Sequence, residues 1–228
     1  MAIKYESIVP WGRSFEEYVD MFNLTELDLN KNILGCGDGP ASFNSIMKQK
    51  CKNAVSIDPI YRFSRDEIAK RIKETYQNVV NQTINNQDKF IWTKIKSVGD
   101  LANIRMAAMN EFLSDYETGK QEGRYICAEL PDLQFCDKQF DLALVSHFLF
   151  LYTANLSLDF HLQAIDEILR VSKEIRIFPL LDLNAVRSIY VDEIISRYKE
   201  MDYLVEEKKV DYEFQKGGNT LLRIKSRN

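Results

Sequence analysis

A glycine cluster and one aspartate are the residues best suited to hold a ligand in this sequence. The cluster, Gly35-Cys36-Gly37-Asp38-Gly39, stands between an apolar run and Pro40. Glycines let a backbone turn tightly against a ligand, and a helix that follows presents its amino-terminal end to an anion. Asp58 follows Gly39 by 19 residues, at the end of a second apolar run. A carboxylate there can accept hydrogen bonds from both hydroxyls of a ribose, so the pair predicts an adenosine-containing ligand.

The spacing of the glycines discriminates between cofactors. The dinucleotide fingerprint G-x-G-x-x-G requires glycine where Pro40 stands, and this disfavours a nicotinamide cofactor. Asp58-Pro59-Ile60-Tyr61 is similar to the D-P-P-Y tetrad of enzymes that methylate amino groups of DNA. It follows the second expected strand rather than the fourth, which disfavours that interpretation too.

Two further polar residues are candidates for the site. Arg13 precedes the first expected helix and could pair with a carboxylate, since a guanidinium suits bidentate contact; the alternative is a solvated surface arginine. His147 ends the fourth expected strand, where parallel-sheet proteins bind ligands, and a neutral imidazole there could accept a substrate proton. A structural histidine is the alternative, and it is the expectation for His161, which lies within an amphipathic helix.

Aromatic residues near these positions have two interpretations. Phe148, Phe150 and Tyr152 follow His147 and either line an acceptor pocket or belong to the core. Trp11 and Tyr61 flank the expected cleft and carry the same two interpretations.

Apolar periodicity predicts the elements that position these residues. A capping box at Ser14 and Glu17 begins a helix over 14–23, and strands are expected near 32–35, 54–58, 125–128, 142–146 and 175–178. Further helices are expected after Pro40, over 158–171 and around 189–198. The segment 62–121 is longer than one crossover needs and is expected to be a helical insertion, interpreted as a lid. Ser64 and Glu67 make a second capping box near its start, and one of its helices is expected to end at Gly119. Two strand-like runs, 204–214 and 219–226, predict an antiparallel hairpin turning over 215–219.

Composition excludes several classes of protein. The 228 residues fit a single domain, and 30 basic against 34 acidic residues give a net charge of -4, which disfavours a nucleic-acid partner, an RNA acceptor included. The longest apolar run, 142–152, is too short for a bilayer about 30 Å thick, so no membrane span is expected. Charges near the amino terminus disfavour a signal peptide and lead us to expect a cytoplasmic protein. The four cysteines form no C-x-x-C pair and only two histidines occur, so no metal site is expected.

With these motifs, the sequence resembles the class I S-adenosylmethionine-dependent methyltransferases over most of its length, and within them a bacterial branch to which we attach no substrate. The resemblance rests on the glycine cluster, Asp58, Ala128-Glu129 and the strand Phe140 to Ser146. It implies an α/β, Rossmann-like fold with a seven-stranded, mostly parallel sheet in the order 3-2-1-4-5-7-6 and helices on both faces. The acid that this class has two residues before its first glycine is Ile33 here, and Asn32 and Asp38 are the candidates to replace it.

The resemblance also implies roles for the site residues. Glu129 and the backbone of Leu130 would bind adenine, Asp58 the ribose, and the loop 35–39 the methionine part of S-adenosylmethionine. The expected cofactor site comprises Arg13, Gly35, Cys36, Gly37, Asp38, Gly39, Asp58, Pro59, Glu129, Leu130 and Ser146. The expected acceptor pocket comprises Trp11, Tyr61, His147, Phe148 and Tyr152, with His147 as the catalytic candidate.

We therefore expect one methyltransferase-type domain over 1–228, with a helical cover over 1–27, that methylates a small molecule. Two alternatives stay open. One is a module that binds S-adenosylmethionine or a protein partner without catalysis, which the missing acid favours. The other, less favoured, is a nicotinamide-dependent oxidoreductase.

Overall fold

The computed structural model describes residues 10–227. In chain order its main helices and strands are α1 (Phe15–Phe22), α2 (Glu26–Leu29), β1 (Ile33–Cys36), α3 (Phe43–Gln49), β2 (Ala54–Ile57), α4 (Arg65–Asn85), α5 (Val98–Gln121), β3 (Tyr125–Ile126), β4 (Leu142–Ser146), α6 (Leu158–Val171), β5 (Glu174–Phe178), α7 (Val191–Glu200), β6 (Leu204–Lys209) and β7 (Thr220–Lys225).

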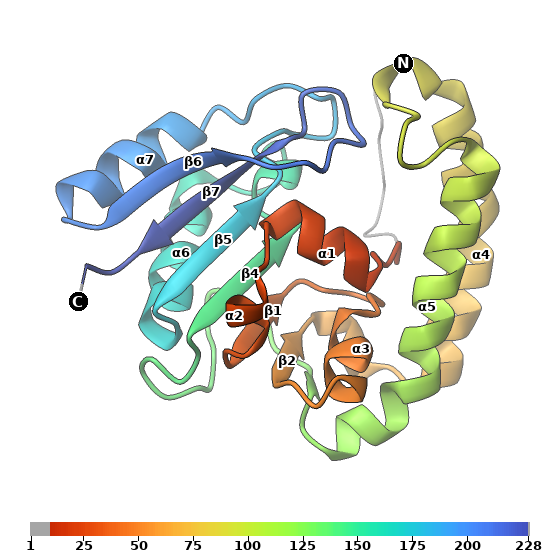
Figure 1. Cartoon of the computed structure of the whole chain (residues 1–228), viewed down its shortest axis with the longest axis horizontal. Coiled ribbons are helices and arrows are strands. Elements are labelled where there is room, and N and C mark those ends of the chain that lie inside the picture. The colour runs from red at the N-terminus through yellow and green to blue at the C-terminus, as the bar shows by residue number, and fades with distance from the viewer. Residues whose placement is uncertain (1–9, 228) are drawn as a thin grey trace.

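The strands form one sheet in the order β3-β2-β1-β4-β5-β7-β6 (Figure 1). The first five strands are parallel, and β7 pairs antiparallel with both β5 and β6. This confirms the expected fold class. Chain direction across the sheet reverses between β1 and β4, and ligands bind at such a switch point, beyond the carboxyl ends of the strands.

Alternating side chains of the central strands give the sheet two apolar faces. Leu142 and Leu144 of β4 pack with α1 and α3, whereas Ala143 and Val145 pack with α6 and α7. Helices therefore cover both faces of the parallel part of the sheet (Figure 1).

The expected insertion is a helical pair between β2 and β3. Helices α4 and α5 stand side by side (Figure 1) at the edge of the sheet that β3 forms, and they enclose a core of their own with Tyr61 and Tyr125. The Ser64 hydroxyl and Glu67 carboxylate make the predicted capping box of α4. Helix α5 runs past Gly119, where we expected it to end, and stops before Gly123, whose φ of +72° suits glycine. Gly119 is needed for another reason, because a Cβ there would lie 2.4 Å from the Tyr125 ring.

The tip of this helical pair is joined to the loop between β6 and β7. The Ile91 amide donates to Phe214 O at 2.7 Å, the Lys216 amide donates to Lys89 O at 2.9 Å, and the rings of Phe90 and Phe214 stack at 4.7 Å. We call this junction, residues 89–92 with 214–216, the clasp.

The clasp also explains a correction to the expected hairpin. Pairing of β6 with β7 ends at Lys209 and Thr220, so 210–219 is a long loop rather than a turn over 215–219. The loop leaves the ladder because Tyr212 turns into the molecular interior and Phe214 packs in the clasp. Two smaller differences concern Ile189, which precedes α7 and is 76% exposed, and the short α2, which we did not expect.

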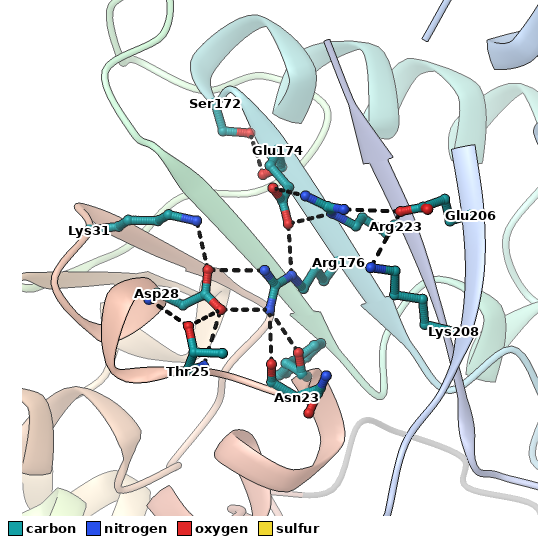
Figure 2. Close-up of polar contacts among 11 residues, drawn as sticks. Asn23, Thr25, Asp28, Lys31, Ser172, Glu174, Arg176, Glu206, Lys208 and Arg223 are labelled. Carbon is teal, nitrogen blue, oxygen red and sulfur yellow. Dashed lines mark hydrogen bonds and ion pairs between the residues drawn. The ribbon is translucent and has the colours of Figure 1, made fainter. Parts of the chain in front are cut away.

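A charged network lies on the sheet beneath α2 (Figure 2). Arg176 of β5 donates to both carboxylate oxygens of Asp28 and to Glu174 Oε1, and Arg223 of β7 also binds Glu174. Arg176 Nη1 donates to Phe22 O at 2.9 Å as well. This network replaces apolar packing where β5 meets the amino-terminal segment.

Within residues 10–227, no helix has both the length and the apolar character needed to cross a membrane. The same residues contain no grouping of three His, Cys, Asp or Glu side chains suited to a metal ion.

Candidate functional site

A cavity of about 870 Å³ lies at the carboxyl ends of the parallel strands. The loops after β1, β2, β3, β4 and β5 all contribute to its wall, as expected for a doubly wound sheet. Most of the residues that the sequence singled out line it. They are Trp11, Arg13, Gly37, Asp38, Gly39, Asp58, Pro59, Glu129, Leu130, Ser146, His147, Phe148 and Tyr152.

The glycine loop and Asp58 lie in direct contact. The Gly39 amide donates to Asp58 Oδ2 at 2.9 Å, and the Ile60 amide donates to Oδ1 at 2.8 Å. Each carboxylate oxygen keeps a lone pair for a further donor. Gly37 and Gly39 have φ values of +69° and +54°, and a Cβ on Gly37 would lie 3.2 Å from Phe148. The loop is therefore a bare backbone cradle beside a carboxylate, although burial raises the pKa of Asp58.

Asp38 is turned back beneath this loop. Its carboxylate accepts from the Tyr18 hydroxyl at 2.8 Å and from the Ser56 hydroxyl at 2.6 Å. Only glycine fits at position 35, since a Cβ there would lie 1.8 Å from Asp38 Oδ2. Burial, reinforced by the nearby charge of Asp58, raises the pKa of Asp38 to about 6 against the opposing effect of the two hydroxyls.

Asn32 and Asp38 are the two candidates to replace the acid that is missing at Ile33. Asp38 lies at the glycine loop, whereas Asn32 does not. Asn32 is exposed at the amino end of β1, where its backbone N–H donates to Asp141 Oδ2 at 3.1 Å. That end of the strand is opposite the cavity.

Arg13 lies in the cavity wall rather than on the solvated surface. Its Nη1 donates to Trp11 O at 3.0 Å, while its Nε is buried with no protein partner. Burial and the charge of Arg105 lower the pKa of Arg13, yet an arginine stays protonated in proteins. A buried, partly unpaired guanidinium facing a cavity suits a carboxylate or another anion.

Beside Arg13 lies an ionic group that sequence reasoning missed. The Glu17 carboxylate accepts from Arg105 of α5 and from the Tyr212 hydroxyl, the latter at 2.8 Å. The signal that could have revealed Arg105 is its position on the buried stripe of α5, four residues after Leu101, where an apolar residue was due. Tyr18 and Tyr212 carry no comparable signal, because their partners are remote in the sequence.

His147 forms the wall after β4 with a left-handed backbone, φ +51°. Its amide donates to Phe178 O at 2.7 Å, and its ring Nδ1 is 3.1 Å from Ser146 Oγ. Burial and the charges of Arg13 and Arg105 hold the pKa of His147 well below its usual value. The imidazole is therefore neutral at physiological pH, as acceptance of a proton requires.

Four candidates lie outside the cavity. Tyr61 is fully buried in the core of α4 and α5, and its hydroxyl supports the glycine loop by donating to Gly39 O at 2.7 Å; its expected place in the acceptor pocket is corrected accordingly. Gly35 and Cys36 belong to β1, and the Cys36 side chain packs in the core beneath the sheet. Phe150 is likewise core.

His161 is structural, as expected, with both ring nitrogens facing backbone carbonyls. Its Nδ1 is 2.8 Å from Ser157 O and its Nε2 is 3.0 Å from Leu149 O.

Comparison with known proteins places the chain in a family. No model of a known family matches it. It is 39% identical over 215 residues to the uncharacterized protein MJ0045 of Methanocaldococcus jannaschii, covering 94% of each chain. The chain belongs to the MJ0045 family.

Comparison with solved structures concerns the fold of this chain. The pyocyanin biosynthetic protein PhzM is 10% identical and matches 92% of this chain and 54% of its own with a TM-score of 0.50, a likeness that shows fold alone. A SAM-dependent methyltransferase from Aquifex aeolicus is 13% identical and matches 91% of this chain and 90% of its own, with a TM-score of 0.42. With its strand order, this MJ0045-family chain has the class I S-adenosylmethionine-dependent methyltransferase fold.

Proposed function

We propose that this chain binds S-adenosylmethionine in the cavity and methylates a small-molecule acceptor. The observation that carries the proposal is the contact between the glycine loop and Asp58 at the switch point of the sheet. It sets a backbone cradle beside a carboxylate whose two oxygens can each accept another hydrogen bond, as a ribose requires.

The cavity provides a partner for each part of the cofactor. Asp58 would accept from the ribose hydroxyls, Glu129 and the backbone of Leu130 would border the adenine, and the glycine loop would hold the methionine part. The guanidinium of Arg13, which lines the cavity, would pair with the cofactor carboxylate.

S-adenosylmethionine supplies a methyl group already activated on a sulfonium, so the protein contributes chiefly orientation, desolvation and a base. His147 lines the cavity as a neutral imidazole and takes the proton that the acceptor loses. Phe148 and Tyr152, close behind it, line the acceptor side with Trp11.

A small acceptor is favoured by the way the cavity is covered. Val79 and Thr83 of α4 line it, as do Phe90 and Phe214 of the clasp, so the insertion forms one wall as an acceptor lid would. The lining combines these side chains with charged groups of α4 and the turn before it, namely Arg62, Glu67, Lys70, Arg71 and Glu74, which suits a compact molecule with both an apolar part and a polar or charged part.

Calorimetric titration with S-adenosylmethionine tests the proposal. Asp58→Ala should weaken binding by about 1 to 3 kcal/mol, because two hydrogen bonds from the ribose lose their acceptor. Asp137→Ala is the matched control, since that carboxylate is exposed, pairs with Arg170, and does not line the cavity. Absence of binding to the folded wild-type chain would reject the function, and equal affinities for wild type and Asp58→Ala would remove Asp58 from the site.

A further inference from the structure

Two arginines of the cavity wall have incomplete hydrogen bonding. Arg13 and Arg105 both line the cavity, and from each guanidinium only Nη1 donates a hydrogen bond to a described residue. The acceptors are Trp11 O for Arg13 and Glu17 Oε2 for Arg105. The Nε of each arginine is buried without a protein partner. A guanidinium has five N–H donors in fixed directions, so most of the donors of these two side chains are unused.

Other buried arginines of the molecule are more fully paired. In Arg176 of β5 and in Arg124, all three guanidinium nitrogens donate to oxygen acceptors. Among the arginines of residues 10–227, a buried nitrogen without a partner occurs at Arg13 and Arg105 alone. Buried polar groups nearly always have a hydrogen-bond partner, so incomplete pairing at two arginines of the cavity indicates a site for an anionic ligand.

A series of contacts joins Arg105 to His147 along one wall of the cavity. Glu17 accepts from Arg105 and, through its other carboxylate oxygen, from the Tyr212 hydroxyl at 2.8 Å. The Tyr212 ring meets the Phe178 ring edge-on at 5.8 Å, and the Phe178 ring meets the His147 ring in the same way at 5.6 Å. The guanidinium and the proton-accepting imidazole are therefore parts of the same wall.

Apolar side chains accompany Arg105 on this wall. Leu101 lies one helical turn before it on the same face of α5 and lines the cavity as well. Phe214 follows Tyr212 by two residues and lines the cavity together with Phe90 of the clasp. Arg105 itself is 0% exposed to solvent. A buried guanidinium among apolar groups suits a ligand with an anionic end and an apolar body.

We propose that the methyl acceptor is a carboxylate whose anionic group binds Arg105 and whose apolar part lies against the clasp. The inference rests on the proposed function, which makes this ligand the acceptor and leaves Arg13 to the carboxylate of the cofactor. A planar carboxylate matches the fork of a guanidinium. Glu17 already shares Arg105 and repels a second anion, which favours a singly charged carboxylate over a phosphate of nearly two charges.

A carboxylate at Arg105 would also assist the base. Burial and the positive charges of Arg13 and Arg105 hold the pKa of His147 well below its usual value. The carboxylates of cofactor and acceptor would offset these two charges, so the pKa of His147 should rise when both ligands are bound. The imidazole then becomes a stronger base at the stage at which it receives a proton.

Calorimetric titration of the cofactor-free protein with pairs of small molecules tests the inference. The pairs are benzoate with benzamide and hexanoate with hexanamide, which differ in charge and little in shape. We expect at least one carboxylate to bind the wild type about tenfold or more tightly than its amide, because a hydrogen bond to a charged group is stronger than one to a neutral group.

Two variants place the charge that binds the carboxylate. Glu17→Gln keeps a residue suited to the capping box of α1 but removes the negative charge that competes for Arg105, so carboxylates should bind more tightly. The double variant Arg105→Gln with Glu17→Gln removes both charges together, and we expect it to bind carboxylate and amide equally. An Arg105–Glu17 pair with a structural role alone would produce neither change.

Matched substitutions elsewhere control for these variants. Arg170→Gln with Glu167→Gln removes an arginine–glutamate pair that does not line the cavity, and the preference for carboxylates should stay. Arg13→Gln should weaken the binding of S-adenosylmethionine and also keep the preference. Circular dichroism confirms that each variant is folded.

Three results would overturn the inference. The first is a wild type that binds carboxylates no more tightly than amides, a comparison that needs no variant. The second is a preference that survives in the double variant, as it would if Arg62 or Lys70 of the cavity wall held the carboxylate. The third is a double variant that loses affinity for S-adenosylmethionine as Arg13→Gln does, which would assign Arg105 to the cofactor.

Glu17→Gln decides the case if the double variant does not fold, since unchanged or weaker carboxylate binding there would also contradict the inference. The titrations with carboxylates use no cofactor. A chain that prefers carboxylates but does not bind S-adenosylmethionine would keep the anion site and lose the proposed methyl transfer, so the two failures are distinguishable.

Discussion

At the scale of single residues, Asp38 has the most unusual environment in the site. Its carboxyl is buried under the glycine loop with only hydroxyl partners, and its pKa rises to about 6 from 3.8. The folded chain therefore binds this proton more tightly than the unfolded chain does. The stability it contributes is fully present below about pH 4 and is lost as the pH rises through about 6.

Asp38→Asn should remove this dependence. A shift of roughly two pKa units corresponds to about 3 kcal/mol, so the wild type should lose up to that amount relative to Asp38→Asn between about pH 4 and about pH 7. Urea unfolding at a series of pH values measures the difference, with Asp137→Asn as an exposed control. A difference that stays constant over this range would show that Asp38 is not perturbed as described.

How far the site could be predicted depended on where each partner lies in the sequence. The glycine loop and Asp58 follow consecutive strands of a parallel sheet, so local pattern was enough to bring them together. Tyr18 and Tyr212 acquire their roles only when α1 and the loop 210–219 fold over the cavity, a contact that no local spacing encodes. Tyr61 was misplaced for the same reason, since its packing depends on α5.

At the scale of elements, the position of α5 depends on a glycine that lies within the helix. A Cβ on Gly119 would meet the Tyr125 ring at 2.4 and 2.6 Å, where the helix packs on β3. Gly119→Ala should therefore destabilise the chain by about 1 to 3 kcal/mol through overpacking, despite the better helix propensity of alanine.

Gly99→Ala in the first turn of the same helix is the matched comparison. The nearest atom to its added Cβ would be Ser97 Oγ at 3.8 Å, so propensity alone acts and the change should stabilise by up to about 1 kcal/mol. Chemical denaturation of both variants gives opposite signs if the close approach is real. Two stabilised variants would mean that α5 can move away from β3.

Helices and strands with strong apolar periodicity were predictable, whereas the residues at which they end were less predictable. The capping boxes at Ser14 and Ser64 located the starts of α1 and α4 because the signal is contained within four residues. The end of α5 was wrong because Gly119 makes room for Tyr125 of β3 rather than ending the helix, and the length of the loop 210–219 was wrong because Phe90, on which Phe214 packs, lies far away in the sequence.

At the scale of the whole molecule, the network in Figure 2 fastens the amino-terminal segment to the sheet. Hydrogen bonds from Lys31, Thr25 and Arg176 hold the pKa of Asp28 well below its usual value, although burial opposes them. The stabilisation from Asp28 is thus present above about pH 4 and is lost as the pH falls further.

Arg176→Met should destabilise the chain by about 3 to 5 kcal/mol, because it leaves Asp28 and Glu174 buried without their shared partner. Lys173→Met is the control: Lys173 pairs with Asp141 at the surface and should contribute less than about 1 kcal/mol. Urea denaturation measures both. Equal effects would show that the network contributes no more than an exposed pair.

The strand order of the molecule was predictable from the resemblance of the motifs, not from periodicity alone. Alternating helices and strands indicate a parallel sheet, but many orders satisfy that pattern. The network at Arg176 was not predictable, since its members come from α2, β5, β6 and β7 and meet only in the folded chain.

The clasp and the cavity wall have a practical consequence. The chain has two tryptophans: Trp11 lines the cavity, and the Trp92 ring lies 5.4 Å from Phe214 in the clasp. Light absorbed only by indole therefore produces emission from these two places and nowhere else in the molecule. Intrinsic tryptophan fluorescence of the unlabelled protein can therefore report the binding and release of ligands.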